Sequence, residues 1–243
     1  MTATTGIGQL AVEYDLAPPA AAALERLVDL IEADDLAPTT VRDRDRIVQD
    51  HIADSLSGLK LDSLREATTL ADLGSGAGMP GIPLALALPD TEVRLVETNG
   101  RKADFLERAV AAVGSPANLS VVRARAEEWS DGIDANDVIT ARALGPLPVV
   151  LEYAAPLLAL GGSLVVWRGR RDPEAEAEAE GTAEVLGLQG QPPTRVVPYA
   201  GAEHRYLHLF SKVRQTPAGY PRRAGRALKR PLGRQAASDR DRR

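Results

Sequence analysis

Apolar residues in the first quarter of the chain recur at helical spacing. The pattern predicts a helix over residues 18–33, and four apolar side chains share one side of it: Leu24, Leu27, Val28 and Ile31. A polar break containing proline follows, and a second apolar stripe predicts another helix over residues 41–61. We therefore expect residues 1–66 to form an N-terminal helical extension.

From Thr69 onward, short apolar runs alternate with helical patterns. The runs predict five strands: 69–73, 92–97, 119–122, 137–141 and 162–167. Helical patterns such as 100–113 and 146–158 lie between them, and this alternation predicts a parallel sheet covered by helices on both faces. Two further strands, near 194–197 and 205–212, have no long helix between them and predict an antiparallel C-terminal edge. An α/β domain is thus expected over residues 67–213.

Composition fits one such domain with a small appendage. The 243 residues are 44% hydrophobic and 26% charged, which is ordinary for a globular protein. No run approaches the roughly 18 apolar residues of a membrane span, and the N-terminus lacks a basic region before an apolar core, so we expect a cytoplasmic protein without a membrane partner. The chain has no cysteine, which excludes disulfides, thiolate metal ligands and a cysteine nucleophile.

Charge is distributed unevenly along the chain. Residues 212–243 contain eleven Lys and Arg against two Asp, a net charge of +9, whereas the remainder has 18 basic and 32 acidic residues, a net charge of −14. A basic tail on an acidic body indicates a polyanionic partner, because phosphate contacts depend on Lys and Arg. We expect residues 214–243 to be a partly disordered tail. Residues 235–243 fit a solvated terminus, while for 220–230 a solvated terminus and a phosphate contact both stay open.

A glycine-rich loop follows the first predicted strand, with glycines at positions 74, 76, 78 and 81. Glycine adopts backbone conformations that other residues avoid and lets a ligand approach the main chain. In an open α/β sheet, ligands bind in the crevice beyond the carboxyl ends of the strands, where this loop is expected. By itself, such a loop is also typical of an ordinary turn.

Two acidic residues narrow the choice of ligand. Asp72 lies two residues before the first glycine, where a carboxylate would repel the pyrophosphate of a dinucleotide. The same carboxylate favours S-adenosylmethionine, which carries a sulfonium and an ammonium. Glu97, at the end of the next strand, can accept hydrogen bonds from both ribose hydroxyls. A turn cap for Asp72 and a solvated strand end for Glu97 are the simpler interpretations. Together the two residues favour a Rossmann-like class I S-adenosylmethionine-dependent methyltransferase.

The residues after the fourth strand limit the atom that is methylated. Enzymes acting on exocyclic amines of bases usually place Asn/Asp-Pro-Pro-aromatic there, whereas this chain reads Thr-Ala-Arg-Ala over 140–143. Methylation of pyrimidine carbon 5 normally needs a cysteine, which the chain lacks. A ring nitrogen with an available lone pair, such as guanine N7, is an acceptor that needs no general base. The absence of both features excludes these other acceptor atoms, but it does not by itself select guanine.

Several stretches together resemble the bacterial ribosomal RNA small subunit methyltransferase G family, also called glucose-inhibited division protein B. They are His51–Leu56, Asp72–Leu84, Glu97–Lys102, Arg125–Trp129, Thr140–Ala143, Thr216–Arg223 and Lys229–Leu232. The resemblance covers roughly residues 20–232, and the run from Met79 to Pro83 is more specific than the glycines alone. The Trp-Asn pair that this family usually carries near residues 29–40 is missing here.

The resemblance implies N7-methylation of a guanosine in 16S rRNA, with S-adenosylmethionine as donor and 16S rRNA or the small ribosomal subunit as partner. Gly74 and Met79 would contact the cofactor from the loop, with Gly76 and Gly78 beside them. Ala126 and Glu127 would flank the adenine. Arg142 would close the site beside the methyl donor. The expected RNA-binding residues lie in the tail: Arg222, Arg223, Lys229 and Arg230.

Some assignments stay open at this stage. The catalytic candidates are His51 and Arg142, but His51 equally suits a core or capping histidine and Arg142 a salt-bridge partner at a strand end. No metal site is expected, since His204 and His208 share one face of a predicted strand without a third ligand. The alternative functions are a methyltransferase for a small molecule or protein, a nicotinamide-dependent oxidoreductase and a non-catalytic RNA-binding relative.

Overall fold

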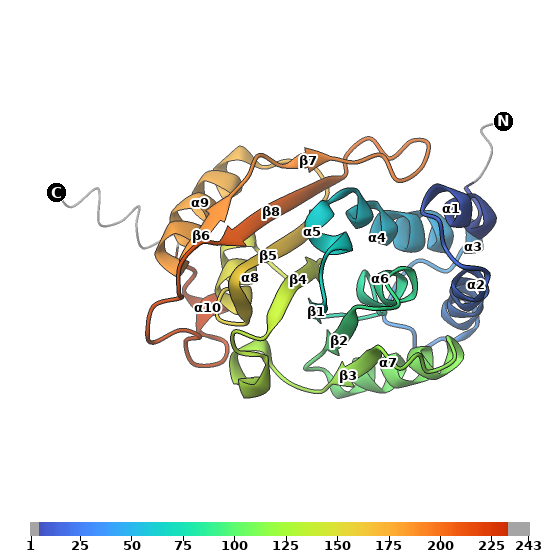
Figure 1. Cartoon of the computed structure of the whole chain (residues 1–243), viewed down its shortest axis with the longest axis horizontal. Coiled ribbons are helices and arrows are strands. Elements are labelled where there is room, and N and C mark those ends of the chain that lie inside the picture. Colours follow the sequence, from blue (N-terminus) through green and yellow to red (C-terminus); the bar gives the residue numbers. More distant parts are fainter. Residues whose placement is uncertain (1–4, 233–243) are drawn as a thin grey trace.

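A computed structural model describes residues 5–232, and its centre is one eight-stranded sheet (Figure 1). The strands are β1 (Thr69–Leu73), β2 (Glu92–Val96), β3 (Leu119–Val122), β4 (Asn136–Arg142), β5 (Leu158–Arg168), β6 (Leu188–Gly190), β7 (Thr194–Arg195) and β8 (Tyr206–Lys212). Their order is β3-β2-β1-β4-β5-β8-β6, with β7 beside β8. Strands β1 to β5 are parallel, and β8 runs antiparallel to β5, β6 and β7. The mostly parallel sheet with an antiparallel edge is confirmed.

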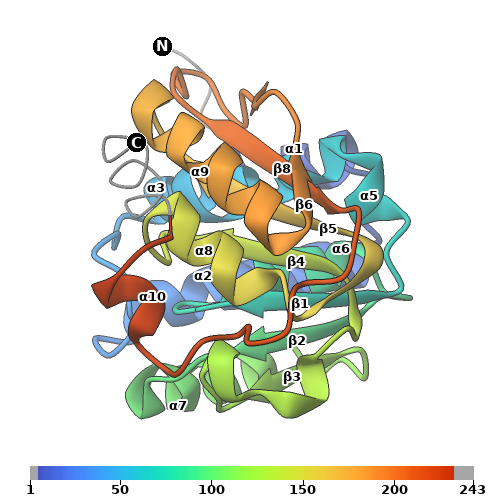
Figure 2. The ribbon, with the colours of Figure 1, turned by 90° about the vertical axis from the view of Figure 1, so that its left-hand side faces the viewer.

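Alternating side chains of the central strands build one apolar core on each face of the sheet. On β1, Leu70 belongs to the first core, whereas Ala71 and Leu73 belong to the second, because successive strand residues point to opposite faces. The first core is covered by α1 (Ile7–Glu13), α2 (Pro18–Ala33), α6 (Gly81–Ala87) and α7 (Gly100–Ala112). The second is covered by α8 (Leu147–Ala154), α9 (Pro173–Leu186) and α10 (Arg226–Lys229), which face the viewer in Figure 2.

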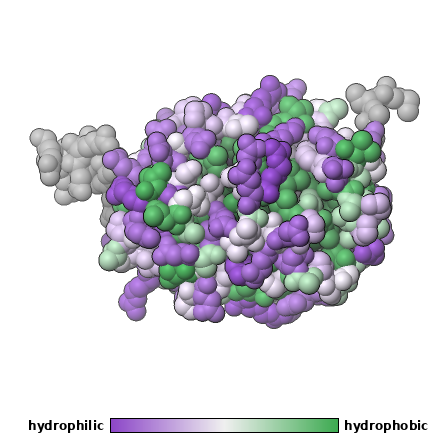
Figure 3. Space-filling view, in the orientation of Figure 1, coloured by the Kyte–Doolittle hydropathy of each residue, from purple (hydrophilic) through white to green (hydrophobic). Residues whose placement is uncertain are grey.

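The helix α2 has the bounds that the sequence predicts, and its four predicted apolar residues are fully buried: Leu24, Leu27, Val28 and Ile31. They belong to the same core as side chains of β1, β2 and α7. The N-terminal helices therefore help to close the first face of the sheet. No helix within residues 5–232 is long and apolar enough to span a membrane. Figure 3 shows hydrophilic and hydrophobic residues interspersed over the visible face.

The helical segment predicted over residues 41–61 is present over residues 44–60, although it is not one regular α-helix. The segment consists of four short pieces: α3 (Arg44–Ile47), a π-helical turn (Val48–Ala53), α4 (Asp54–Leu56) and a 3₁₀ turn (Ser57–Lys60). Side chains from the sheet bond to carbonyls of this stretch: Arg142 Nη1 donates to Asp50 O at 3.0 Å and Trp167 Nε1 donates to Asp54 O at 2.8 Å. Donors inserted into a helical ladder distort it, and apolar spacing alone does not reveal them. A short helix, α5 (Asp62–Arg65), leads into β1.

The basic tail follows β8, and its first part packs on the second face. Ala227 of α10 is buried there, and Tyr220 and Leu232 pack against the same core. The solvated terminus expected over residues 235–243 lies outside the described residues.

Gly58 lies directly against Trp167 of β5. A Cβ atom at this position would be 2.4 Å from Cζ2 of Trp167, which is closer than real contacts allow. We expect Gly58→Ala to lower the free energy of unfolding by about 1–3 kcal/mol through overpacking, as measured by urea denaturation.

Gly181→Ala is the matched control, because Gly181 is exposed within α9 and its Cβ position is open. This change should stabilise the protein by roughly 0.5–1 kcal/mol, since it removes a helix-interior glycine. If the two substitutions had the same effect, close packing at Gly58 would not be the cause.

Candidate functional site

The glycine-rich loop lies at the carboxyl end of β1, where the strand order reverses. β1 is flanked by β2 on one side and β4 on the other, which is the switch point where open α/β sheets bind ligands. Gly74, Gly76 and Gly78 have φ angles of 68°, 56° and 85°. A side chain is strained at such angles, and at Gly78 a Cβ would also lie 2.3 Å from Cδ1 of Ile82. This backbone path therefore requires glycine.

Asp72 is fully buried beneath the loop. Its Oδ1 accepts a hydrogen bond from Oγ1 of Thr140 on β4 at 2.8 Å, and its Oδ2 accepts one from the Gly81 amide at the start of α6 at 3.2 Å. Burial raises the pKa of Asp72 to about 6, although these hydrogen bonds act in the opposite direction. The carboxyl group therefore joins β1, β4 and α6. Its contact with the positive charges of a ligand stays a prediction from the sequence.

Glu97 follows β2 and is only 4% exposed. Its Oε2 accepts from the Gly76 amide at 3.2 Å, and its Oε1 accepts from the Asn99 amide at 2.8 Å. The amide of Gly74 donates to the carbonyl of Val96 at 2.8 Å. The end of β2 thus holds the glycine loop through main chain and side chain, with the Glu97 carboxylate at the position from which the sequence predicts a contact with ribose.

The other predicted cofactor residues come from two places on the same edge of the sheet. Met79, at the end of the loop, is buried, and its sulfur accepts a hydrogen bond from Oγ of Ser55 at 3.8 Å. Ala126 and Glu127 form a 3₁₀ turn, η3 (Ala126–Glu128), after β3. The Oε1 atom of Glu127 accepts from the Gly225 amide at 2.9 Å, so the C-terminal tail reaches this turn.

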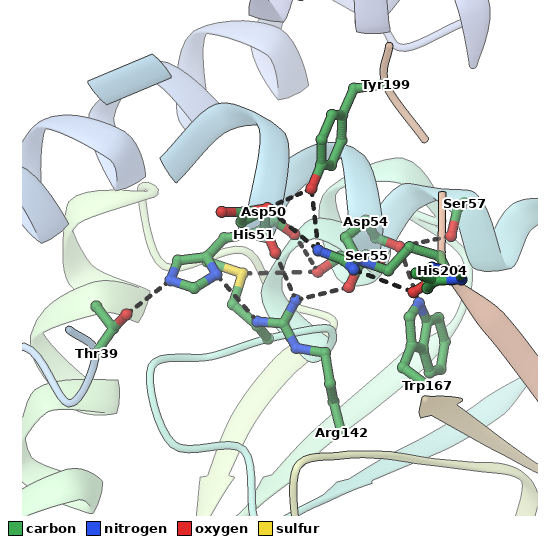
Figure 4. A network of polar contacts seen from close by, with 12 residues as sticks. Thr39, Asp50, His51, Asp54, Ser55, Ser57, Arg142, Trp167, Tyr199 and His204 are labelled. Carbon is green, nitrogen blue, oxygen red and sulfur yellow. Dashed lines mark hydrogen bonds and ion pairs between the residues drawn. The ribbon is translucent and has the colours of Figure 1, made fainter. Parts of the chain in front are cut away.

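Arg142 ends β4 and points into the π-helical turn (Figure 4). Its Nη1 donates to Oδ2 of Asp54 at 3.1 Å as well as to the carbonyl of Asp50, and its Nη2 lies 3.3 Å from Nδ1 of His51. Burial raises the pKa of Asp54 above its usual value, and the charge of Arg142 opposes this effect. Arg142 thus forms the salt bridge that was considered for it, and this ion pair with Asp54 joins the N-terminal segment to the sheet.

His51 is engaged through both ring nitrogens. Nε2 lies 2.8 Å from Oγ1 of Thr39, and Nδ1 faces the guanidinium of Arg142. Burial and the charge of Arg142 lower the pKa of His51 to about 4, so the ring is neutral at pH 7. A guanidinium only donates, so Nδ1 is the acceptor and Nε2 carries the proton that Thr39 accepts. This arrangement fits the satisfied core histidine better than a proton acceptor.

The network also contains Asp50, Tyr199 and Arg205, which were not predicted from the sequence. Tyr199, in the loop between β7 and β8, donates its hydroxyl proton to Oδ1 of Asp50. Arg205 Nη2 lies 3.0 Å from the Tyr199 hydroxyl oxygen, and Arg205 Nε lies 3.4 Å from Oδ1 of Asp54. Tyr199 and Arg205 are about 150 positions away from their aspartate partners, so no local motif signals them. Figure 4 shows the N-terminal segment, β4 and the β7–β8 loop meeting here.

The four basic tail residues have two kinds of environment. Arg222 makes a bidentate ion pair with Glu152 of α8, which is 2% exposed. Arg223, Lys229 and Arg230 are exposed.

The shared strand face predicted for two histidines is wrong. His204 lies in the loop before β8, and His208 is buried on that strand. In the part of the chain that the structure describes, no three His, Cys, Asp or Glu side chains are grouped so that they could hold a metal ion.

Several solved structures share this fold. An S-adenosylmethionine-dependent methyltransferase from Aquifex aeolicus matches with a TM-score of 0.55 and 18% identity, over 69% of this chain and 93% of that chain. Aeropyrum pernix fibrillarin, solved with natively bound S-adenosyl-L-methionine, matches with a TM-score of 0.52 and 17% identity, over 65% and 72%. The likeness shows a fold, and that fold is the Rossmann-like fold of class I methyltransferases.

Sequence relatives identify the family within this class. Residues 23–203 match the rRNA small subunit methyltransferase G family. The protein of that name from Rubrobacter xylanophilus is 42% identical over 79% of this chain and 75% of its own length. The one from Desulfitobacterium hafniense is 38% identical over 86% of each. The chain therefore belongs to the rRNA small subunit methyltransferase G family, and the resemblance noted from its motifs is confirmed.

The partly buried environment of His51 predicts a pH dependence of stability. Its pKa falls from the usual 6.5 to about 4 on folding, so the unfolded chain binds the proton more readily. The contribution of this effect to stability is fully present above about pH 6.5, and it is lost as the pH falls toward 4. We expect the difference in unfolding free energy between wild type and His51→Gln to shrink over that interval in urea titrations. A difference that does not vary with pH would contradict the lowered pKa of His51. NMR titration of the imidazole ring measures that pKa directly.

Proposed function

We propose that the chain transfers the methyl group of S-adenosylmethionine to N7 of a guanosine in 16S rRNA, free or within the small ribosomal subunit. The observation that carries the proposal is the glycine loop at the switch point, held by Glu97 from β2 and lying on the same edge as Arg142 of β4. Membership of the rRNA small subunit methyltransferase G family supports the choice of RNA as substrate.

The residues at this edge fit the cofactor. The loop has no side chains at the three positions where the positive φ angles require glycine. A Cβ at Gly76 would meet only the Gly74 carbonyl oxygen, at 3.7 Å. The Gly76 backbone is thus open for close approach of a ligand. Glu97 would accept from the ribose hydroxyls, and Ala126 and Glu127 would flank the adenine. When bound, S-adenosylmethionine supplies an electrophilic methyl group.

The chemistry available here suits an acceptor that needs no deprotonation. His51 is neutral with both ring nitrogens engaged, and Asp54 is paired with Arg142. The chain contains no cysteine for covalent attack on a pyrimidine. Guanine N7 already presents a lone pair, so the protein's work is positioning and the exclusion of water. Arg142, beside the expected methyl donor, would then be a positioning group and no proton acceptor.

The test is methylation of defined RNA by the purified protein. Borohydride and aniline cleave RNA at 7-methylguanosine, so 16S rRNA or small subunits treated with enzyme and cofactor should gain one cleavage site. Comparing deproteinised rRNA with intact subunits identifies the preferred form. Transfer of labelled methyl without that cleavage would mean that an atom other than guanine N7 is methylated. No transfer to either RNA would favour a small-molecule or protein substrate.

Glu97 gives a second prediction. Glu97→Ala should weaken S-adenosylhomocysteine binding by about ten- to a hundredfold, because charge-assisted hydrogen bonds contribute roughly 1.5–3 kcal/mol each. Glu97→Gln keeps one acceptor oxygen and should lose less. Isothermal titration calorimetry measures both, with NADH as the comparison ligand. Wild-type affinity in folded Glu97→Ala would remove Glu97 from the cofactor site.

The exposed tail residues give a third prediction. Combined replacement of Arg223, Lys229 and Arg230 by alanine should weaken rRNA binding most at low salt. The slope of log affinity against log salt should become shallower by about 0.7–0.9 for each phosphate that the protein no longer neutralises. Cofactor affinity serves as the internal control and should not change. An unaltered salt slope would show that these residues do not contact phosphates.

A further inference from the structure

The C-terminal segment, defined here as residues 216–232, follows a path that solubility or RNA contact does not require. Figure 2 shows it passing α8 on its way to α10. Tyr220 and Leu232 pack against the second core, and Ala227 is buried in it. A segment that only contacted RNA would not need these apolar contacts with the core.

An ion pair fixes the middle of this segment to α8. Glu152 is 2% exposed, and both of its carboxylate oxygens accept from the guanidinium of Arg222. The same guanidinium donates through Nη2 to the carbonyl of Arg230 at 2.9 Å, which closes the loop that contains α10. Bidentate pairing gives geometric specificity, and a buried carboxylate of this kind holds its partner in one place. Arg222 thus sets the position of the residues that follow it.

The segment held in this way reaches η3. The Gly225 amide donates to Oε1 of Glu127 at 2.9 Å, and Gly225 has a φ of 74°, which favours glycine. The helix α8, which carries Glu152 and Tyr153, contacts η3. Burial first, and then the charges of Glu127 and Glu152, raise the pKa of Tyr153 to about 12. A three-residue 3₁₀ turn has few internal hydrogen bonds, so it depends on outside contacts for its position.

We propose that Arg222 and the Gly225 amide are positioning groups for the cofactor's adenine, acting through Glu127. This inference rests on the proposed function, in which η3 flanks that ring. The C-terminal segment is then a wall of the cofactor site, and Arg222 has a different role from its exposed neighbours. Arg222 keeps the segment on α8, the Gly225 amide keeps the Glu127 carboxylate in place, and η3 keeps its shape for the ligand.

The experiment measures S-adenosylhomocysteine affinity by calorimetry in the full-length protein. Arg222→Ala should weaken binding about tenfold, as expected when one well-made hydrogen bond is removed. Glu127→Ala should weaken it by a similar factor, and the double variant should lose little more, because both changes break one chain of contacts. Arg226→Ala is the control, since Arg226 is an exposed basic residue on the same segment. The KM for the methyl donor should rise while kcat at saturating donor changes little.

A second readout needs no cofactor. Amide hydrogen exchange over residues 124–129 should be faster in Arg222→Ala than in wild type or Arg226→Ala, because η3 loses its support. If Arg222→Ala does not fold, the neutral pair Arg222→Gln with Glu152→Gln replaces it.

The outcomes are distinct. Wild-type affinity and exchange in a folded Arg222 variant, or fully additive losses in the double variant, would overturn the inference. Loss of rRNA affinity alone would assign Arg222 to RNA contact and would also overturn it. A wild-type protein that does not bind S-adenosylhomocysteine would overturn the proposed function itself.

Discussion

The buried carboxyl group of Asp72 is the constraint on which the site depends. It accepts from Thr140 of β4 and from the first amide of α6, while the adjoining main chain carries the glycine loop. A buried carboxyl group is tolerated only when its oxygens are satisfied, so these three elements are fixed relative to each other. The end of β2 adds a second support through Glu97. The loop is thus shaped by the protein before any ligand arrives.

The second organising feature is the polar network around Arg142. It joins the π-helical turn of the N-terminal segment to the end of β4, and Tyr199 and Arg205 bring in the β7–β8 loop. Three regions far apart in sequence therefore converge beside the glycine loop. The π-helical turn follows from this convergence, because Arg142 bonds to the carbonyl of Asp50 within it and Trp167 bonds to the carbonyl of Asp54 directly after it. Such turns are frequent at functional sites.

Much of the fold could be predicted because its signals are local. The apolar spacing of α2, the alternation of strand and helix, and the glycines at positive φ each follow from a short stretch of sequence. The features that the sequence does not reveal depend on partners that are distant along the chain. The helix expected over 41–61 contains a π-helical turn where donors from β4 and β5 bond to carbonyls, and Arg222, which was assigned to RNA contact, pairs with Glu152 of α8. Asp72 was interpreted by its charge, whereas its burial beneath the loop depends on the tertiary packing.

The most direct measurement compares Asp72→Asn with Asp72→Ala, using S-adenosylhomocysteine affinity and unfolding free energy together. Asn keeps the size and two hydrogen bonds, since the Thr140 hydroxyl can accept instead of donate, so affinity should stay within about threefold of wild type. Ala leaves a buried amide and hydroxyl unpaired, so it should cost about 2–4 kcal/mol of stability and most of the binding. If Asp72→Asn folded with wild-type stability yet lost binding as fully as Asp72→Ala, the charge would act on the ligand directly, and the account of Asp72 as the support of the loop would be wrong.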